Sequence, residues 1–276
     1  MQRRPRSRRK SPARLSRFWP SARLRRKWFR AYRRAPAAVQ VAVALAAALT
    51  VWAALNFAYQ VIRKPTELFF PVSEALHKTP TETWRDYAPS FRRHSTPVMT
   101  PELLAALAQV EASGNPVART YWRWSWRLQP FEVYRPASSA VGMYQITDGT
   151  FEQARRWCIH DHAVVAEGPW HAWRSCWLNE LYFRVVPSHS VELTSAYLTR
   201  GVAIALARHG IKSATIEQKQ KLAMLIHLCG AGAGDGYARR GLRLKRGQRC
   251  GDHDARRYLA KVDAMRKTFV RLAGTR

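Results

Sequence analysis

The chain has 276 residues, which is long enough for one or two domains with a hydrophobic core. It carries 47 Lys and Arg against 18 Asp and Glu, so its formal net charge is +29 at pH 7. Much of this charge lies near the N-terminus, so the positive charge is not spread evenly along the chain.

Residues 1–36 form a strongly basic segment. They contain fifteen Lys or Arg and no acidic residue, and the first acid of the chain is Glu67. We expect this tail to be disordered or bound to a surface. Nucleic acid and the anionic lipid of the cytoplasmic leaflet are both possible ligands. Because a membrane segment follows directly, topology and lipid suffice to explain the charge, and no nucleic-acid partner is expected.

Residues 37–62 are predicted to be one transmembrane helix. The segment is apolar apart from Gln40, Thr50, Asn56 and Gln60, and ~20 apolar residues cross a bilayer. Positive flanks stay in the cytoplasm, so we expect a single-pass inner-membrane protein with its N-terminus inside and the following domain in the periplasm. A cleaved signal peptide is the alternative, but the basic region and the apolar run are both long for one.

Residues 63–99 are expected to be a linker between the membrane and a domain at residues 100–276. The segment is predicted to be mostly irregular, with one short helix around residues 84–91. Its irregularity is indicated by Pro65, Pro71, Pro80, Pro89 and Pro97.

Helical patterns dominate from Thr100 onward, so the domain is predicted to be mainly α. The expected helices are 101–113, 150–158, 174–185, 189–208, 215–228 and 254–272.

A tryptophan-rich stretch at residues 120–134 is the exception to this helical pattern. Trp122, Trp124 and Trp126 alternate with other residues, which predicts a small β-hairpin turning through residues 128–130. We expect most of these tryptophans to lie in the core, the alternative being a groove in which sugar rings stack.

Four cysteines, Cys158, Cys176, Cys229 and Cys250, all follow the membrane segment. An even count on the exported side favours disulfides, most simply Cys158 with Cys176 and Cys229 with Cys250, although four cysteines allow three pairings. The alternatives are free buried thiols and a zinc site that uses "CIHDH" with His171 and Cys176. That spacing matches no common structural zinc pattern, so no metal is expected.

The stretch "LAALAQVEASGNP" is predicted to end a helix that begins near Pro101, after the capping residue Thr100. Glu111 lies four residues after Leu107 and seven after Leu104, which places it on the apolar face. Gly114, Asn115 and Pro116 end the helix just beyond it.

Glu111 is therefore the candidate catalytic residue. Partial burial and the negative end of the helix dipole are both expected to raise the pKa of this carboxyl, and a carboxyl that stays protonated near neutral pH suits a general acid. A solvent-facing Glu111, or one paired with Arg119, is the alternative.

The segment "SSAVGMYQIT", residues 138–147, is too polar for a core element. Gly142 permits a positive φ or a close approach, and the amide of Gln145 both donates and accepts hydrogen bonds. These are properties of a loop that contacts a ligand.

In combination, a helix ending in Glu, "NP" close behind it and "SSAVGMYQIT" before a new helix resemble the lytic transglycosylase domain of the lysozyme-like superfamily. The resemblance covers about residues 85–270 and implies a lysozyme-like fold. It implies that Glu111 is the sole catalytic acid and base. It also implies a substrate cleft lined by Ser139, Gly142, Met143, Tyr144 and Gln145.

Two further segments extend the resemblance. "RRYLAKV", residues 256–262, is similar to the closing segment of that family and makes Tyr258 a candidate near the catalytic carboxyl, the alternative being helix packing. "IHLCG", residues 226–230, stands where the family has A-Y-N-A-G, so His227 replaces the Tyr of a glycan-binding segment and Leu228 its Asn. A further departure is Ala112, which replaces the Ser that usually follows the catalytic Glu.

The resemblance implies cleavage of the MurNAc–GlcNAc β-1,4 bond of peptidoglycan with formation of 1,6-anhydro ends and without a cofactor. Glu132 and Asp148 are the nearest candidates for a second carboxylate, which a hydrolytic muramidase would need. A non-catalytic wall-binding scaffold of the same fold is the other alternative. The expected partners are peptidoglycan glycan strands, the inner membrane through residues 37–62, and cell-envelope assembly proteins.

Overall fold

The computed structural model describes residues 22–69, 71–126, 129–166, 168–169, 171–172 and 175–275. The chain divides into two compact units, Met1–Phe57 and Ala58–Arg276. The described residues are mainly helical, with strands only in short hairpins, which confirms the predicted mainly α class.

The first unit contains α1 (Ala22–Arg34) and most of α2 (Ala37–Arg63). Part of the basic tail is thus helical, whereas its residues 1–21 lie outside the described residues. In the described part of the chain, α2 is the one helix that is long and apolar enough to cross a membrane. Together with the disulfides below, it indicates a membrane or secreted protein. The orientation stays a prediction.

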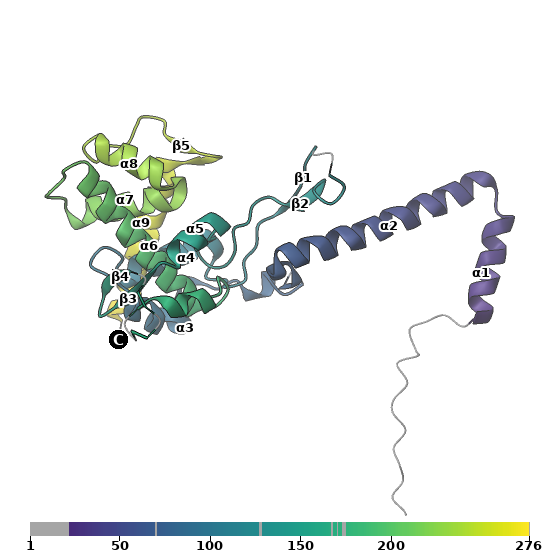
Figure 1. Ribbon diagram of the computed structural model, residues 1–276, viewed down its shortest axis with the longest axis horizontal. Helices are drawn as coiled ribbons and strands as arrows, with labels where there is room; N and C mark the ends of the chain where they lie inside the picture. The colour runs from purple at the N-terminus through teal and green to yellow at the C-terminus, as the bar shows by residue number, and fades with distance from the viewer. Residues whose placement is uncertain are drawn as a thin grey trace, which may run out of the picture. The chain divides into compact units, whose positions relative to one another are not determined.

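The second unit is built around α4 (Pro101–Ala112), which packs against α3 (Pro80–Arg93) and α9 (Ala255–Gly274) (Figure 1). Thr100 caps α4 and Pro101 opens it, as predicted. Six consecutive residues of α4, 103–108, are fully buried. Within the expected linker, α3 is longer than the predicted helix and buries Trp84, Ala88 and Phe91 in the core. That part of residues 63–99 therefore belongs to the packed unit.

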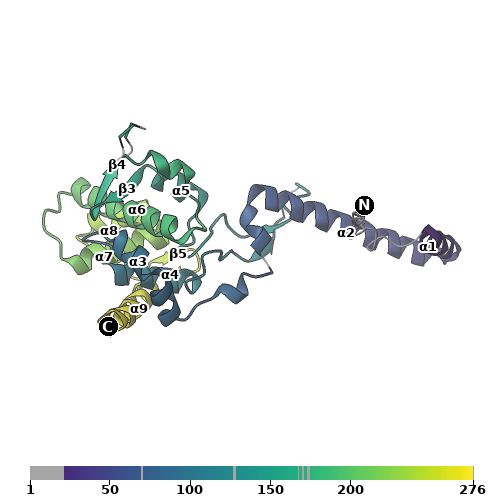
Figure 2. The same ribbon diagram turned by 90° about the horizontal axis from the view of Figure 1, so that it is seen from below.

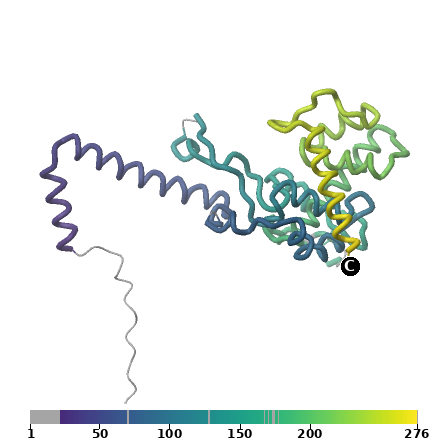
Figure 3. The backbone as a smooth tube through the Cα atoms, turned by 180° about the vertical axis from the view of Figure 1, so that it is seen from behind, coloured from purple at the N-terminus to yellow at the C-terminus, as the bar shows by residue number. Residues whose placement is uncertain are grey.

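The remaining helices complete this unit. Helix α6 (Pro187–Arg208) packs against α7 (Ile216–Cys229) and α8 (Ala231–Arg239). Helix α7 also contacts α9, which is the long yellow helix at the C-terminus in Figure 3. A capping box at Thr215 opens α7, as its side chain and that of Gln218 bond each other's backbone amides. The other helical elements are the short helix α5 (Asp148–Ala154) and the 3₁₀ turns η2 (Pro65–Phe69), η3 (Glu74–Leu76) and η4 (Trp177–Leu181).

The described residues form three two-stranded antiparallel hairpins outside the helices. They pair β1 (Trp122–Trp124) with β2 (Tyr134–Pro136), β3 (Trp157–His160) with β4 (Ala163–Ala166), and β5 (Arg249–Cys250) with β6 (His253–Asp254).

The β3–β4 hairpin corrects two predicted helices. The helix expected at 150–158 ends at Ala154, because the chain turns at Asp161 and His162, both with positive φ, and pairs with itself. Of the helix expected at 174–185, only the 3₁₀ turn η4 is observed, and residue 174 lies outside the described residues.

The tryptophan hairpin forms where expected, but its side chains are not core. Trp122 is half-buried, whereas Trp124 is 67% exposed and Trp126 is fully exposed. An isolated two-stranded ribbon has no second layer to bury both of its faces. The rings of Trp122 and Trp124 instead pack on Tyr134 of β2, at centroid distances of 5.2 and 4.8 Å. Residues 127 and 128 of the predicted turn lie outside the described residues.

The two predicted disulfides, Cys158–Cys176 and Cys229–Cys250, are both confirmed. Their sequence separations are 18 and 21 residues, and bridges that close loops of this size contribute about 3 kcal/mol each through the unfolded state. Because the bridges use all four thiols, the considered zinc site loses its sulfur ligands. The described residues contain no cluster of three or more His, Cys, Asp or Glu that could hold a metal ion.

Candidate functional site

Two adjoining cavities of about 620 and 240 Å³ form a cleft in the second unit. Gln145 and Leu228 line both cavities, so the two adjoin at these side chains. The larger cavity is lined by Glu111 and Tyr258, and the smaller by His227. The cleft thus brings together four of the residues proposed from the sequence.

Glu111 lies in the last turn of α4, and Ser113, the C-cap residue after Ala112, has a left-handed conformation. The Tyr258 hydroxyl, from α9, donates a hydrogen bond to Glu111 Oε1. His227 Nε2, from α7, lies 3.5 Å from the same oxygen. The Glu111 side chain is 19% exposed, so it is largely enclosed while still reaching the cavity. The considered pairing with Arg119 is not observed, because Arg119 binds Glu67.

The protonation of Glu111 differs from the prediction. Burial, the largest influence, raises the pKa of Glu111, but interactions with His227 and the hydrogen bond from Tyr258 lower it further than burial raises it. The charge of His253 adds to the lowering. The pKa of Glu111 therefore lies below its usual value in the ligand-free protein. The sequence argument considered burial and the helix dipole, and it lacked the two partners from distant helices.

Replacing His227 with Asn should shift the activity of this site to higher pH. A general acid is active while it is protonated, so its activity is lost as the pH rises through its pKa. The lower that pKa is, the lower the pH at which activity is lost. The substitution removes the hydrogen bonding and the charge by which His227 lowers the pKa of Glu111, so the pKa rises. Cleavage rates of wild type and His227→Asn across a pH series measure the shift. His209→Asn, which changes a histidine that pairs with Asp235, is the control and should leave the profile unchanged.

Gly142 and Gln145 shape the loop that faces Glu111. Gly142 has φ +81°, and a Cβ there would lie 2.4 Å from the Arg184 carbonyl oxygen, so only glycine fits. Gln145 also has a positive φ, of 48°, and its amide nitrogen donates to the carbonyls of Ala118 and Gly142. The loop thereby holds the Gln145 side chain in the wall of both cavities.

Three other residues of this loop support the fold around the cleft. Met143 and Tyr144, expected to line the cleft, are fully buried, and the Tyr144 hydroxyl donates to the Leu104 carbonyl of α4. They anchor the loop to the core because the chain turns them inward after Gly142. The Ser139 hydroxyl accepts from the Asp148 amide, so Ser139 supports the start of α5.

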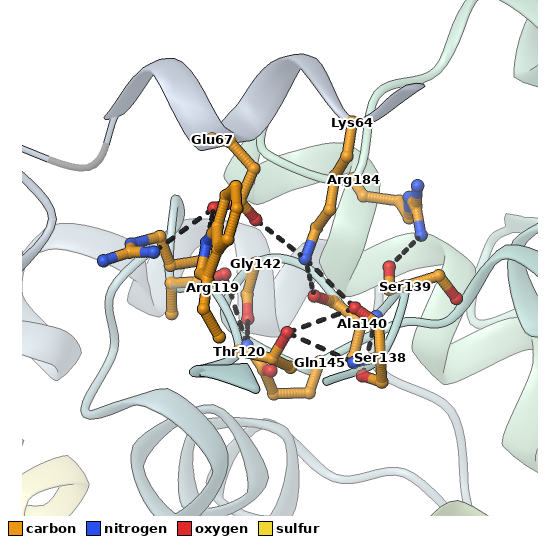
Figure 4. Close-up of polar contacts among 12 residues, drawn as sticks. Lys64, Glu67, Arg119, Thr120, Ser138, Ser139, Ala140, Gly142, Gln145 and Arg184 are labelled. Atoms are coloured by element: carbon orange, nitrogen blue, oxygen red, sulfur yellow. Dashed lines mark hydrogen bonds and ion pairs between the residues drawn. The ribbon is translucent and has the colours of Figure 1, made fainter. Parts of the chain in front are cut away.

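A buried ion pair just after α2 holds the other side of the loop (Figure 4). Lys64 Nζ donates to the Ala140 carbonyl at 3.0 Å and to the Ser138 carbonyl at 3.3 Å, and it lies 3.2 Å from Glu67 Oε1. Burial, the largest influence, lowers the pKa of Lys64, while Glu67 opposes this. Sequence reasoning missed this pair, although the first acid of the chain three residues after a Lys was a visible signal.

Glu67 has no exposed surface and binds three groups. Besides Lys64, it accepts hydrogen bonds from Arg119 at 3.2 Å and from the Trp122 indole at 2.8 Å. The segment after α2 is therefore connected to two chain segments that border the cleft. Glu67 binds Arg119 and Trp122 on either side of Thr120, Lys64 binds the Ser138 carbonyl, and both Thr120 and Ser138 line the larger cavity.

The second carboxylates considered from the sequence do not reach the cleft. Among the described residues, the walls of the two cavities include neither Glu132, which pairs with Arg63 and Arg135, nor Asp148, which pairs with Arg184. Two other acids, Asp252 and Asp254, line the cavity of Glu111. Asp254 caps α9 by accepting from the Arg257 amide, so Asp252 is the remaining alternative.

The Cys229–Cys250 disulfide borders the cleft. Cys229 ends α7 two residues after His227, and Cys250 lies in β5 next to Arg249 of the larger cavity wall. The bridge therefore ties the histidine-bearing helix to the β5–β6 hairpin. The sequence predicted the pair without indicating this position.

No protein-family model and no curated protein matches the chain.

Proposed function

We propose that this protein is a membrane-anchored lytic transglycosylase that cleaves the glycan strands of peptidoglycan. The observation that carries the proposal is the position of Glu111, a largely enclosed carboxylate in an open cleft with Tyr258, His227 and Gln145 around it. The motifs that resemble the lytic transglycosylases supply the reaction class, and the proposed fold is lysozyme-like.

In the proposed reaction, protonated Glu111 gives its proton to the oxygen of the departing sugar, and the N-acetyl group of the substrate stabilises the cationic carbon. The Glu111 carboxylate then takes the proton of the C6 hydroxyl as that oxygen closes the 1,6-anhydro ring. One carboxyl thus gives and regains one proton. Because its pKa is low in the free protein, entry of the glycan, which displaces the remaining water, is proposed to favour the protonated form.

Tyr258 and His227 are proposed to position this carboxyl. The Tyr258 hydroxyl donates a hydrogen bond that fixes the orientation of Glu111, and the His227 ring lies 3.5 Å from the same carboxylate oxygen. Gln145 is proposed to bind the amide and hydroxyl groups of the glycan. No cofactor takes part in this scheme.

A hydrolytic muramidase is the second candidate, and the presence of Asp252 in the cavity of Glu111 is the observation in its favour. A non-catalytic scaffold has less support, since wall binding does not need an enclosed acid. For either enzyme, the proposed location is the inner membrane with the domain in the periplasm, where envelope assembly proteins are further proposed partners.

The product distinguishes the two enzymes. Purified full-length protein is incubated with peptidoglycan sacculi, and the soluble products are analysed by mass spectrometry. We expect 1,6-anhydro ends, which are one water lighter than the reducing ends made by hydrolysis, and Asp252→Asn should keep most of the activity. Reducing ends that disappear in Asp252→Asn would instead establish the hydrolase.

A further inference from the structure

The β1–β2 hairpin presents large aromatic side chains to solvent. Tyr121 is 70% exposed, Trp124 is 67% exposed and Trp126 is fully exposed, with the exposed Arg123 between them. Exposed tryptophans clustered on one ribbon are unusual for a soluble surface. Trp, Tyr and Arg are, however, the side chains that gather at the boundary between a membrane and water.

The same hairpin is attached to the last turns of α2, which belong to the second unit from Ala58 onward. Gln60 Nε2 donates to the Phe131 carbonyl at 2.6 Å, and the rings of Tyr59 and Phe131 lie 5.5 Å apart. Arg63 forms an ion pair with the buried Glu132. Three contacts therefore fix the hairpin to residues 59–63.

The length of α2 places these turns at the edge of a bilayer. About 20 helical residues cross the hydrocarbon layer, whereas α2 has 27. The polar residues Asn56, Gln60 and Arg63 lie towards the C-terminal end of α2, so the excess turns belong on that side. If α2 spans, residues 59–63 and the hairpin bound to them emerge in the headgroup layer.

Residues that follow α2 also expose apolar side chains. Leu68 is 62% exposed and Phe69 is 40% exposed, in the 3₁₀ turn that begins two residues after α2 ends. Apolar side chains beside the end of a membrane helix gain free energy by entering the interface, as in interfacial helices.

We propose that the β1–β2 hairpin docks onto the phospholipid headgroup layer, with Tyr121, Trp124 and Trp126 inserted at the interface. The exposed Arg123 would bind phosphate groups there. This inference rests on α2 crossing a membrane and is independent of the proposed reaction. Docking of the hairpin would also determine how far the cleft lies from the membrane. Thr120 lines the larger cavity, and the six residue-to-residue steps from Thr120 to Trp126 span about 20 Å, so the cleft edge would be held near the bilayer.

Photo-crosslinking tests the proposal. The photoreactive residue p-benzoylphenylalanine replaces Trp126 in the full-length chain, which is reconstituted in nanodiscs of phosphatidylethanolamine and phosphatidylglycerol and irradiated. Mass spectrometry then measures lipid adducts. The control carries the same residue at Ile216, which is the first residue of α7 and is 51% exposed. Within the second unit, α7 lies on the other side from the hairpin (Figure 1) and from the last turns of α2 (Figure 2).

We expect lipid adducts at position 126 to exceed those at position 216 several-fold. Equal yields at both positions would overturn the proposal. Crosslinks at position 126 that join two copies of the chain, without lipid adducts, would also overturn it and identify the hairpin as a contact between copies. Unchanged thermal unfolding would show that each labelled protein is intact.

Discussion

Glu111→Gln is expected to reduce peptidoglycan cleavage by about 10²–10⁴-fold or more, because it removes the only proton donor that the proposed reaction uses. The amide keeps the size of the side chain and an oxygen that can accept from the Tyr258 hydroxyl. The free energy of unfolding should therefore change by about 1 kcal/mol or less. The measurement is the release of soluble fragments from sacculi, with thermal unfolding recorded on the same preparations.

Glu102→Gln is the matched control for this substitution. It makes the same chemical change on the same helix, α4, but in the first turn. Activity should stay near that of the wild type. A fully active Glu111→Gln protein would contradict the site assignment, whereas a folded and inactive one that still binds sacculi would separate catalysis from wall binding.

Lys64→Met should lower the free energy of unfolding by about 2–4 kcal/mol and also reduce cleavage. The substitution leaves the fully buried Glu67 with Arg119 as its remaining cationic partner, and the carbonyls of Ser138 and Ala140 lose a donor. Since the loop from Ser138 to Gln145 forms a wall of the cleft, its loosening should displace Gln145. Chemical denaturation and the sacculus assay measure the two effects.

Lys221→Met provides the comparison for Lys64. Lys221 pairs with Glu217 at 2.8 Å, but both side chains are largely exposed, at 45% and 70%. A solvent-exposed pair one helical turn apart contributes little to stability, so this variant should be nearly as stable as the wild type. Equal stability of the two variants would show that the Lys64–Glu67 pair does not hold the loop.

Local patterns in the sequence determined much of the second unit. The cap at Thr100, the proline at the start of α4 and the apolar spacing up to Glu111 are properties of one helix, and the structure agrees with them. The capping box of α7 is equally local. Both disulfide pairings followed the simplest order along the chain.

Short hairpins were the weakest part of the prediction. The β3–β4 pair interrupts a segment that reads as helix from Thr150 to Cys158, because strand pairing and a nearby disulfide override helix propensity there. The alternation in the tryptophan hairpin predicted strands correctly but not burial. Alternation identifies one face of a ribbon, whereas burial depends on whether another layer covers that face.

The sequence by itself determined the apolar helix α2, the mainly α class, the disulfide pairs and the position of Glu111 at a helix end, since each depends on residues that are near one another in the chain or on a count of residue types. Only the tertiary structure decided the pKa of Glu111, because Tyr258 and His227 come from helices more than 100 residues away. It likewise decided that Lys64 and Glu67 support the cleft loop some 70 residues further on. Electrostatic interactions depend on distance in space and on burial, and neither is encoded in local periodicity.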